Sequence, residues 1–127
     1  MIVRHIDDLK DSEQFVATEK FISTRLIVKN DGMGYSVHHT RVPQGTEIHC
    51  HYKDHLETNY CIAGEGEVFD VATGKTYTIG VGSMYALDKH DQHVLRATKG
   101  ELHLICVFNP PLAGGERHND QGGYDAA

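Results

Sequence analysis

The chain has 127 residues, of which 39% are hydrophobic and 24% charged, as expected of one globular domain with a single core. A formal net charge of −6 without a long Lys/Arg run excludes an extended basic surface for nucleic acid or anionic membranes. No apolar run approaches the ~20 residues of a membrane-spanning helix, and the mixed-charge N-terminus lacks the apolar centre of a signal peptide.

Short segments of β-type composition follow one another along the chain, separated by turn signals. In chain order they cover residues 24–29, 35–42, 46–51, 57–63, 67–71, 75–80, 83–88, 93–98 and 101–108. The turn signals are Asp31-Gly32, Pro43-Gln44-Gly45, Gly64-Glu65-Gly66, Thr73-Gly74 and Lys99-Gly100. This spacing predicts an all-β sandwich or small barrel, and only residues 6–15 have the composition of a short helix.

The composition changes after Phe108 to a segment rich in Gly, Pro and polar residues, NPPLAGGERHNDQGGYDAA. From composition alone this tail is expected to be disordered. The alternative is a lid that orders over a pocket. Residues 1–127 are therefore predicted to form a single domain, with 109–127 as its C-terminal tail.

An altered metal-binding motif lies in the middle of the chain. Small metal-binding barrels carry the pattern G-x5-H-x-H-x3-E-x6-G, whose positions are matched here by Gly45, His51, Glu57 and Gly64. The second histidine position holds Lys53, a cation at neutral pH and a poor metal ligand. A metal site in this frame therefore needs ligands from elsewhere in the chain.

A second pattern of the same barrels, G-x5-P-x-G-x2-H-x3-N, is matched in order by Gly74, Gly80, Gly82, Tyr85 and Lys89. The two frames together predict a cupin barrel, a double-stranded β-helix. Tyr85 replaces the histidine of this pattern, and a nearby cation favours its phenolate form. His93 is the candidate for the missing neutral donor, so that the predicted metal ligands are Glu57, Tyr85 and His93.

Each of these residues also has an ordinary structural role. Tyrosine in Ser-Met-Tyr-Ala-Leu is typical of a core or rim position, and histidines in turn-rich stretches are typically exposed. Period-2 alternation places Glu57, Asn59 and Cys61 on one face of their strand. If that face is inward, Glu57 needs a counter-charge or a metal.

Several separated motifs match, in order and spacing, those of a known family. They are MIVR at the start, DGMG (31–34), HYKDHLE (51–57), CIAGEGEV (61–68), LDKHDQH (87–93) and VFNPPLAGGERH (107–118). In these the chain resembles ectoine synthase. The resemblance implies a homodimeric cupin enzyme that uses Fe²⁺, or another divalent ion such as Zn²⁺. It further implies closure of Nγ-acetyl-L-2,4-diaminobutyrate, with loss of water, into the osmoprotectant ectoine.

The resemblance also implies residue roles. The family's metal ligands fall on Glu57, Tyr85 and His93. Its substrate pocket falls on Phe21, Arg25, Thr40, Tyr52, Cys106, Phe108, Glu116 and His118. Position 21 is commonly tryptophan in the family, and Phe21 keeps an aromatic wall but lacks the indole N–H. No ligand role is carried over to His51.

The reaction assigns further tasks to these residues. The attacking amine must lose a proton, for which Glu116 is one candidate base and His118 the alternative. Arg25 offers a bidentate fork for the substrate carboxylate. With Tyr52, these residues form the predicted catalytic set, and the aromatic residues would hold the flexible substrate folded.

Two other functions remain open at this level. One is a cupin Fe²⁺ oxygenase, although oxygen activation usually rests on three histidines, or on two histidines and one carboxylate. The other is a non-catalytic cupin that binds a small molecule. The three cysteines lack C-x-x-C spacing, which predicts reduced thiols and a cytoplasmic protein.

Overall fold

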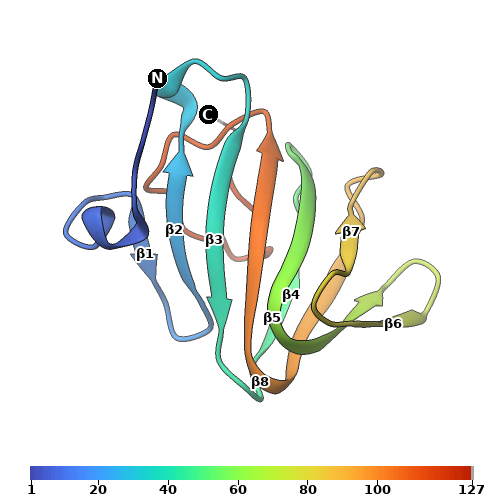
Figure 1. Ribbon diagram of the computed structural model, residues 1–127. Helices are drawn as coiled ribbons and strands as arrows, with labels where there is room; N and C mark the ends of the chain where they lie inside the picture. Colours follow the sequence, from blue (N-terminus) through green and yellow to red (C-terminus); the bar gives the residue numbers. More distant parts are fainter. Residues whose placement is uncertain (127) are drawn as a thin grey trace.

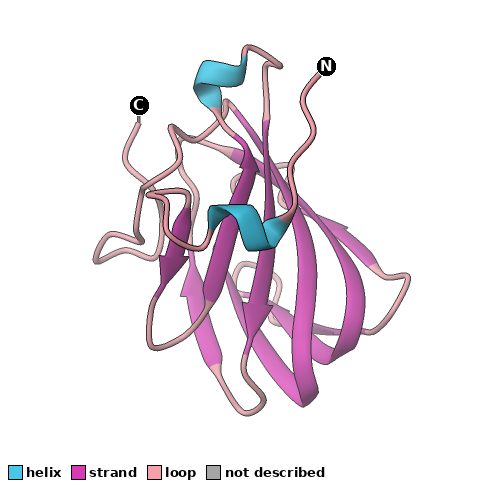
Figure 2. Ribbon diagram, turned by 60° about the vertical axis from the view of Figure 1, so that its left-hand side comes forward, coloured by secondary structure: helices cyan, strands magenta, loops and turns pink. Residues whose placement is uncertain are grey.

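Antiparallel β-strands form the framework of the protein, which is described over residues 1–126 by a computed structural model (Figures 1 and 2). The elements are η1 (Ile6–Leu9), β1 (Phe15–Ala17), β2 (Ile22–Ile27), η2 (Lys29–Asp31), β3 (Ser36–Val42), β4 (Glu47–Cys50), β5 (Leu56–Asp70), β6 (Lys75–Ile79), β7 (Met84–Ala86) and β8 (His93–Asn109). Both η elements are short 3-10 helices, so the all-β prediction is confirmed. No helix within residues 1–126 has the length and apolar character needed to cross a membrane.

Two long strands, β5 and β8, organise the barrel. The strands follow the order β1-β2-β3-β8-β5-β6, with β4 paired to β8 and β7 paired to β5. The first half of β5 pairs with the end of β8, and its second half pairs with the beginning of β8. Both strands are strongly curved in Figure 1, so each contributes to both ends of the fold.

The predicted turns at Gly64-Glu65-Gly66 and Lys99-Gly100 lie inside these long strands, which corrects the expected strand boundaries. The β5–β8 register shifts three times between Cys61 and Gly66, so the chain bends there without reversing. Gly64 has a φ of 78°, and a Cβ at this position would collide with the backbone carbonyl of Glu101. A glycine is required for the bend, which the sequence presented as a turn signal.

The N-terminal region differs from the predicted helix over residues 6–15. Only Ile6–Leu9 is helical, and Phe15–Ala17 instead forms β1, an edge strand paired with β2. The side chain of His5 caps the short helix by accepting a hydrogen bond from the Asp7 backbone N–H at 3.1 Å. Pairing with β2 therefore prevails over local helix propensity in this segment.

The alternation predicted around Glu57 is confirmed. Glu57, Asn59 and Cys61 are buried, whereas the intervening side chains of β5 are exposed. The buried face of β5 meets an apolar core that includes Val42, Leu102 and Leu104, with none of the three more than 1% exposed. The carboxylate of Glu57 thus lies inside the barrel.

The C-terminal tail is packed against the barrel, contrary to the disorder expected from its composition. Leu112 is fully buried, and Tyr124 is only 5% exposed. The backbone N–H of His51 donates to the Gly122 carbonyl at 2.9 Å. A Cβ on Gly122 would collide with the carbonyl of His49, so the glycine allows the tail to approach β4 closely. Gly122, one of the glycines that made the tail look unstructured, is thus one of the residues that let it dock.

Candidate active site

A small cavity of about 30 Å³ lies inside the barrel beneath the docked tail. It is lined by Phe21, His38, Thr40, Ile48, Cys50, Tyr52, Glu57, Asn59, Tyr85, His93, Leu95, Leu104, Cys106, Phe108, His118 and Tyr124. All of the predicted site residues are in this set except Arg25 and Glu116. A cavity of this size holds about one to a few water molecules, far less than the roughly 300 Å³ or more of typical ligand pockets.

The three predicted metal ligands come together here from three strands. Glu57 lies near the start of β5, Tyr85 lies in the middle of β7, and His93 is the first residue of β8. The rings of Tyr85 and His93 meet edge-to-face, with centroids 6.2 Å apart. Within residues 1–126, no group of three or more His, Cys, Asp and Glu side chains is placed to hold a metal. A three-ligand site in this cavity therefore depends on the phenolic oxygen of Tyr85.

The electrostatics of the cavity disfavour a free carboxylate. Burial raises the pKa of Glu57 from 4.5 to about 7. Burial also raises the pKa of the Tyr85 hydroxyl well above its usual value, and the nearby Glu57 carboxyl raises it further. No Lys or Arg is among the described residues that line the cavity. A bound cation would favour the anionic forms of both groups.

The orientation of His93 leaves one ring nitrogen available. Its Nδ1 lies 2.8 Å from the backbone carbonyl of Asp91, which can only accept a hydrogen bond. The proton is therefore assigned to Nδ1, and Nε2 carries the lone pair. Burial lowers the pKa of His93 and keeps the ring neutral, as metal ligation requires.

Aromatic side chains form the wall of the cavity next to the tail. The ring of Tyr52 stacks on that of Tyr124, with centroids 5.4 Å apart and planes 16° from parallel. The hydroxyl of Tyr52 lies 2.9 Å from Nε2 of His118. Burial lowers the pKa of His118 to about 4, and the positive charge of Arg25 contributes to this shift. His118 is therefore a neutral imidazole that lines the cavity and is hydrogen-bonded to Tyr52.

Arg25 and Glu116 form hydrogen bonds with the tail in this structure and do not line the cavity. Arg25 is fully buried, and its guanidinium donates to the Ser23 hydroxyl at 2.8 Å, the Gly114 carbonyl at 2.9 Å and the Tyr124 hydroxyl at 3.3 Å. The carboxylate of Glu116 accepts backbone N–H groups of Ala113 and Gly114, each at 2.7 Å. Burial raises the pKa of Glu116, but the hydrogen bonds from the backbone lower it by more. The pKa is therefore lowered overall, which makes the carboxylate a weaker base.

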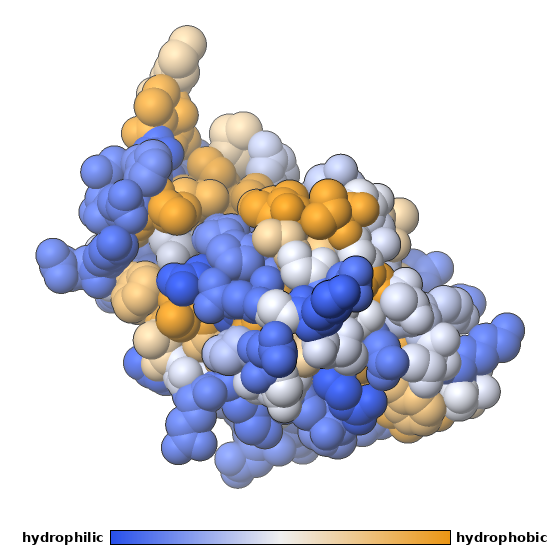
Figure 3. Space-filling view, turned by 60° about the horizontal axis from the view of Figure 1, so that its bottom comes forward, coloured by the Kyte–Doolittle hydropathy of each residue, from blue (hydrophilic) through white to orange (hydrophobic). Residues whose placement is uncertain are grey.

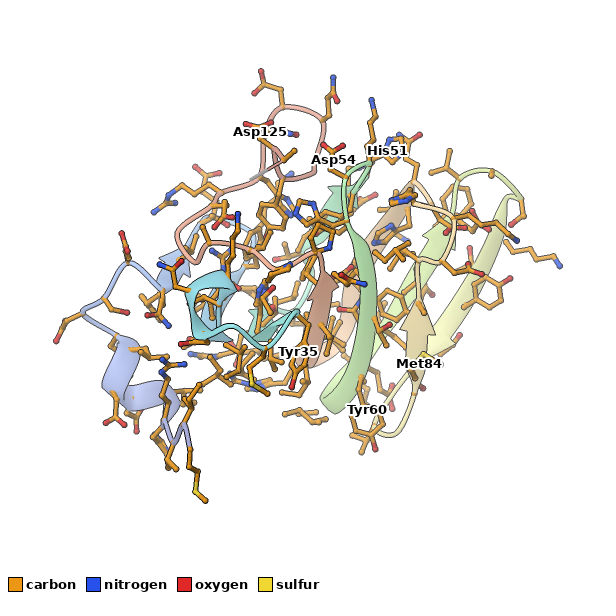
Figure 4. The ribbon with its side chains drawn as sticks, turned by 90° about the horizontal axis from the view of Figure 1, so that it is seen from above. Tyr35, His51, Asp54, Tyr60, Met84 and Asp125 are labelled. Carbon is orange, nitrogen blue, oxygen red and sulfur yellow. The ribbon has the colours of Figure 1, made fainter. Side chains whose placement is uncertain are left out.

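Other predicted residues take distinct places. The Cys106 thiol lies 3.4 Å from the Thr40 hydroxyl on the cavity wall. Lys53 lies outside, where its ammonium donates to the Gln121 side chain at 3.2 Å. His51 lies on the same outer side, where it lines a recess with tail residues 117–122, and Figure 4 shows it on the same side of the molecule as Asp54 and Asp125. Lys53, the residue that departs from the metal motif, thus does not line the cavity.

Apart from three aliphatic residues, the sequence assigned no role to four residues that line the cavity, namely His38, Cys50, Asn59 and Tyr124. Period-2 alternation from Glu57 could have found Asn59, because it is the next inward residue of β5. Cys50 could not be found this way, since its place follows from β4 pairing with β8, which puts it opposite His93. Tyr124 carries no signal in the sequence, because only tail docking brings it to the cavity.

Comparison with known proteins identifies the family and supports the fold. The family model described as "Ectoine synthase" matches residues 1–127. An L-ectoine synthase of Aliivibrio fischeri is 53% identical over 125 residues, which cover 98% of this chain and 97% of that protein. The crystal structure of ectoine synthase from P. lautus has a TM-score of 0.88 and 46% identity, over 96% of this chain and 87% of that one. The cupin domain of Schizosaccharomyces pombe Cnp3, at 12% identity and a TM-score of 0.63 over 73% of this chain and 66% of that one, supports the cupin fold alone.

Proposed function

Because the chain belongs to the ectoine synthase family, we propose that it converts Nγ-acetyl-L-2,4-diaminobutyrate into ectoine and water inside the barrel cavity. A member of this family is an ectoine-forming enzyme of the hydro-lyase type, so the oxygenase and binding-module alternatives are set aside. The observation that carries the proposed site is the convergence of Glu57, Tyr85 and His93 on one buried cavity. Ectoine would then serve as an osmoprotectant in the cytoplasm, where the free thiols of this chain remain reduced.

The donor set of the cavity fits a divalent metal ion. Glu57 would provide a carboxylate, Tyr85 a phenolate and His93 its Nε2, a mixture that suits Fe²⁺ and is also compatible with Zn²⁺. A buried carboxyl without a cationic neighbour is costly when ionised, and a metal ion would remove that cost. Bound Fe²⁺ would act as a Lewis acid that polarises the acetyl oxygen of the substrate.

The cavity walls would hold the substrate in a folded conformation. The substrate amine and its acetyl carbon belong to one flexible molecule, and holding them in contact can account for roughly 7–11 kcal/mol of the barrier. Phe21, Tyr52 and Phe108 provide rigid aromatic surfaces around the cavity, and the Tyr52 and Phe108 rings pack edge-to-face at 5.1 Å. Their burial would also exclude water, which favours a dehydration product.

The geometry favours His118 over Glu116 as the group that receives the amine proton. His118 lines the cavity with its imidazole neutral, whereas the Glu116 carboxylate is turned to backbone N–H groups of the tail. A pKa of about 4 makes His118 a weak base in the empty cavity. The negative carboxylate of a bound substrate would raise that pKa toward the operating range of a general base. Tyr52 would keep the ring in position.

The tail is proposed to act as a lid. The cavity of about 30 Å³ is too small for an N-acetylated diamino acid, so binding requires a movement that enlarges it. A recess of about 780 Å³ lies on the outer side of residues 117–122 and shares Phe21, Ile48 and His118 with the cavity. Arg25 would fasten the closed tail through Gly114 and Tyr124. Release of these two contacts would free its guanidinium for the substrate carboxylate.

A direct assay tests the proposed function. Purified protein loaded with Fe²⁺ is incubated with Nγ-acetyl-L-2,4-diaminobutyrate, and the product is followed by NMR. We expect the cyclic amidine of ectoine to appear at the rate at which the acetylated substrate disappears. We also expect a chelator to stop the reaction and Fe²⁺ to restore it. Unchanged substrate in the presence of loaded protein would refute the assignment.

We further propose that two copies of the chain form a homodimer. Leu56, Tyr60, Ile62 and Met84 are between 40% and 60% exposed on the outer face of β5 and β7. Tyr60 and Met84 are register partners, and both point outward in Figure 4. Figure 3 shows further apolar areas among the polar surface seen from below. A second copy would cover the apolar outer face of β5 and β7 and the outer edge of β7. Sedimentation should give a dimer for the wild type and a monomer for Met84→Lys, and a monomeric wild type would refute the proposal.

A further inference from the structure

The side chain of Asn59 has no hydrogen-bond partner although it is buried. Asn59 is 1% exposed on β5, and neither its Oδ1 nor its Nδ2 is hydrogen-bonded. Buried amides are almost always paired, because leaving both polar atoms without partners is unfavourable. Since Asn59 lines the cavity, its missing partners can be supplied by whatever the cavity binds.

The position of Asn59 places this amide among the candidate metal ligands. It follows Glu57 on the same inward face of β5, and the β5–β7 register sets it directly opposite Tyr85. On its other side it is the register partner of Cys106 in β8. The amide is close enough to the Glu57 carboxyl to oppose the rise in its pKa, but the two groups do not meet hydrogen-bond geometry.

We infer that Asn59 binds the reacting O–C–N unit of the substrate during ring closure. Its Nδ2 donates a hydrogen bond to the acetyl oxygen, and its Oδ1 accepts one from an N–H of the attacking amine. This inference rests on the proposed function. A metal ion at this position would satisfy Oδ1 alone and leave the Nδ2 donors unpaired, whereas an oxygen and an N–H on one carbon satisfy both atoms of the amide.

The inferred contact forms fully only when the ring closes. In the reaction the amine nitrogen bonds to the acetyl carbon, and the acetyl C–O bond breaks. The two hydrogens lost from the nitrogens leave with that oxygen as water. Asn59 neither gains nor loses a proton. The amine N–H and the acetyl oxygen become neighbours on one carbon only in the tetrahedral intermediate, so both hydrogen bonds are strongest near the transition state and should affect kcat.

Asn59→Leu removes both polar atoms while keeping a side chain of similar size. Because the amide has no partner in the free protein, we expect the metal-free variant to melt at the same temperature as the wild type or higher. We expect bound iron to be unchanged. We expect kcat to fall by about 10²-fold or more, with a smaller change in KM. The matched control is Cys61→Val, which alters the next inward side chain of β5 outside the cavity and should leave kcat unchanged.

Three outcomes would overturn the inference. A lower melting temperature for Asn59→Leu would mean that the amide has a partner within the protein. Loss of iron would mean that Asn59 positions Glu57. Wild-type kcat would mean that it does not touch the reacting atoms. If the apolar leucine side chain prevents folding, Asn59→Ala decides by the same iron and kcat measurements. Absence of turnover in the wild type itself would refute the proposed function and is thereby distinguished from a failure at Asn59.

Discussion

Replacement of Glu57 by glutamine tests how the buried carboxyl of the cavity is balanced. In metal-free protein, burial raises the pKa of this group from 4.5 to about 7. One pKa unit corresponds to about 1.4 kcal/mol, so the ionised carboxylate destabilises the metal-free fold by about 3 kcal/mol. Glu57→Gln keeps the size of the side chain and cannot ionise. At pH 8 the metal-free variant should therefore be more stable than the wild type by about this amount.

The sign of the effect gives it a definite pH dependence. Below pH 4.5 the group is protonated in both the folded and the unfolded state, so it contributes no difference. Between pH 4.5 and about 7 the unfolded chain loses its proton first, and the stability of the wild type falls as the pH rises. Well above pH 7 the group is ionised in both states, and the loss is complete. Other titrating groups are common to both proteins, so the difference between variant and wild type isolates this carboxyl.

Urea unfolding of chelator-treated protein between pH 5 and pH 8.5 measures this difference. We expect the variant to unfold at a slightly higher urea concentration than the wild type near pH 5 and at a much higher one at pH 8. Addition of Fe²⁺, or of redox-inert Zn²⁺, should reverse the order at pH 8, because only the wild type retains the carboxylate ligand. A stability difference independent of pH, or a metal-free wild type more stable than the variant at pH 8, would refute the reasoning.

The remaining predictions concern the ligands, the tail and the N-terminal region. Tyr85→Phe and His93→Ala should each lower bound iron and turnover while the protein stays folded, as measured by metal analysis and circular dichroism. Full iron content in either variant would remove that residue from the ligand set. Deletion of residues 113–127, which spares buried Leu112, should abolish turnover but leave iron bound, and wild-type kinetics would end the lid proposal. The pKa of Asp31 is lowered to about 2, chiefly by its hydrogen bond from Arg4, so its contribution to stability is present above pH 3.8 and is lost toward pH 2. Asp31→Asn should therefore lower the thermal midpoint at pH 7 with little effect near pH 2, and an equal loss at both pH values would contradict this origin.

The inward face of β5 could be predicted from the sequence because alternation is a local property. Glu57 and Asn59 are separated by one residue, and their shared orientation follows from strand geometry without knowledge of any partner strand. The bends of β5 and β8 could not be predicted in this way. A glycine such as Gly64 is typical of both a turn and a bulge, so the sequence cannot tell them apart. Only its close contact with Glu101, on a strand far along the sequence, distinguishes the two.

Some residues of the candidate site could be predicted from the sequence, whereas the contacts of others could not. Tyr85 and His93 occupy positions that motif spacing indicated, and they reach the cavity because β7 and β8 both pair with β5. The engagement of Arg25 by the tail was not predictable, because Gly114 and Tyr124 are distant in sequence and lie in a segment of disorder-like composition. Composition reports the average tendency of a segment, whereas docking depended on a few contacts of Leu112, Gly122 and Tyr124.

The pairing of β5 with β8 also determines when a metal ion can act during folding. Glu57 lies at one end of β5, and His93 lies at the opposite end of the paired region, on the first residue of β8. Barrel curvature alone brings these two ends together, so the nascent chain presents no preassembled pair of donors. An ion that binds only the closed barrel would leave the folding rate nearly unchanged and would slow the escape from the native state. Metal occupancy would thereby lengthen the lifetime of the folded enzyme without guiding its formation.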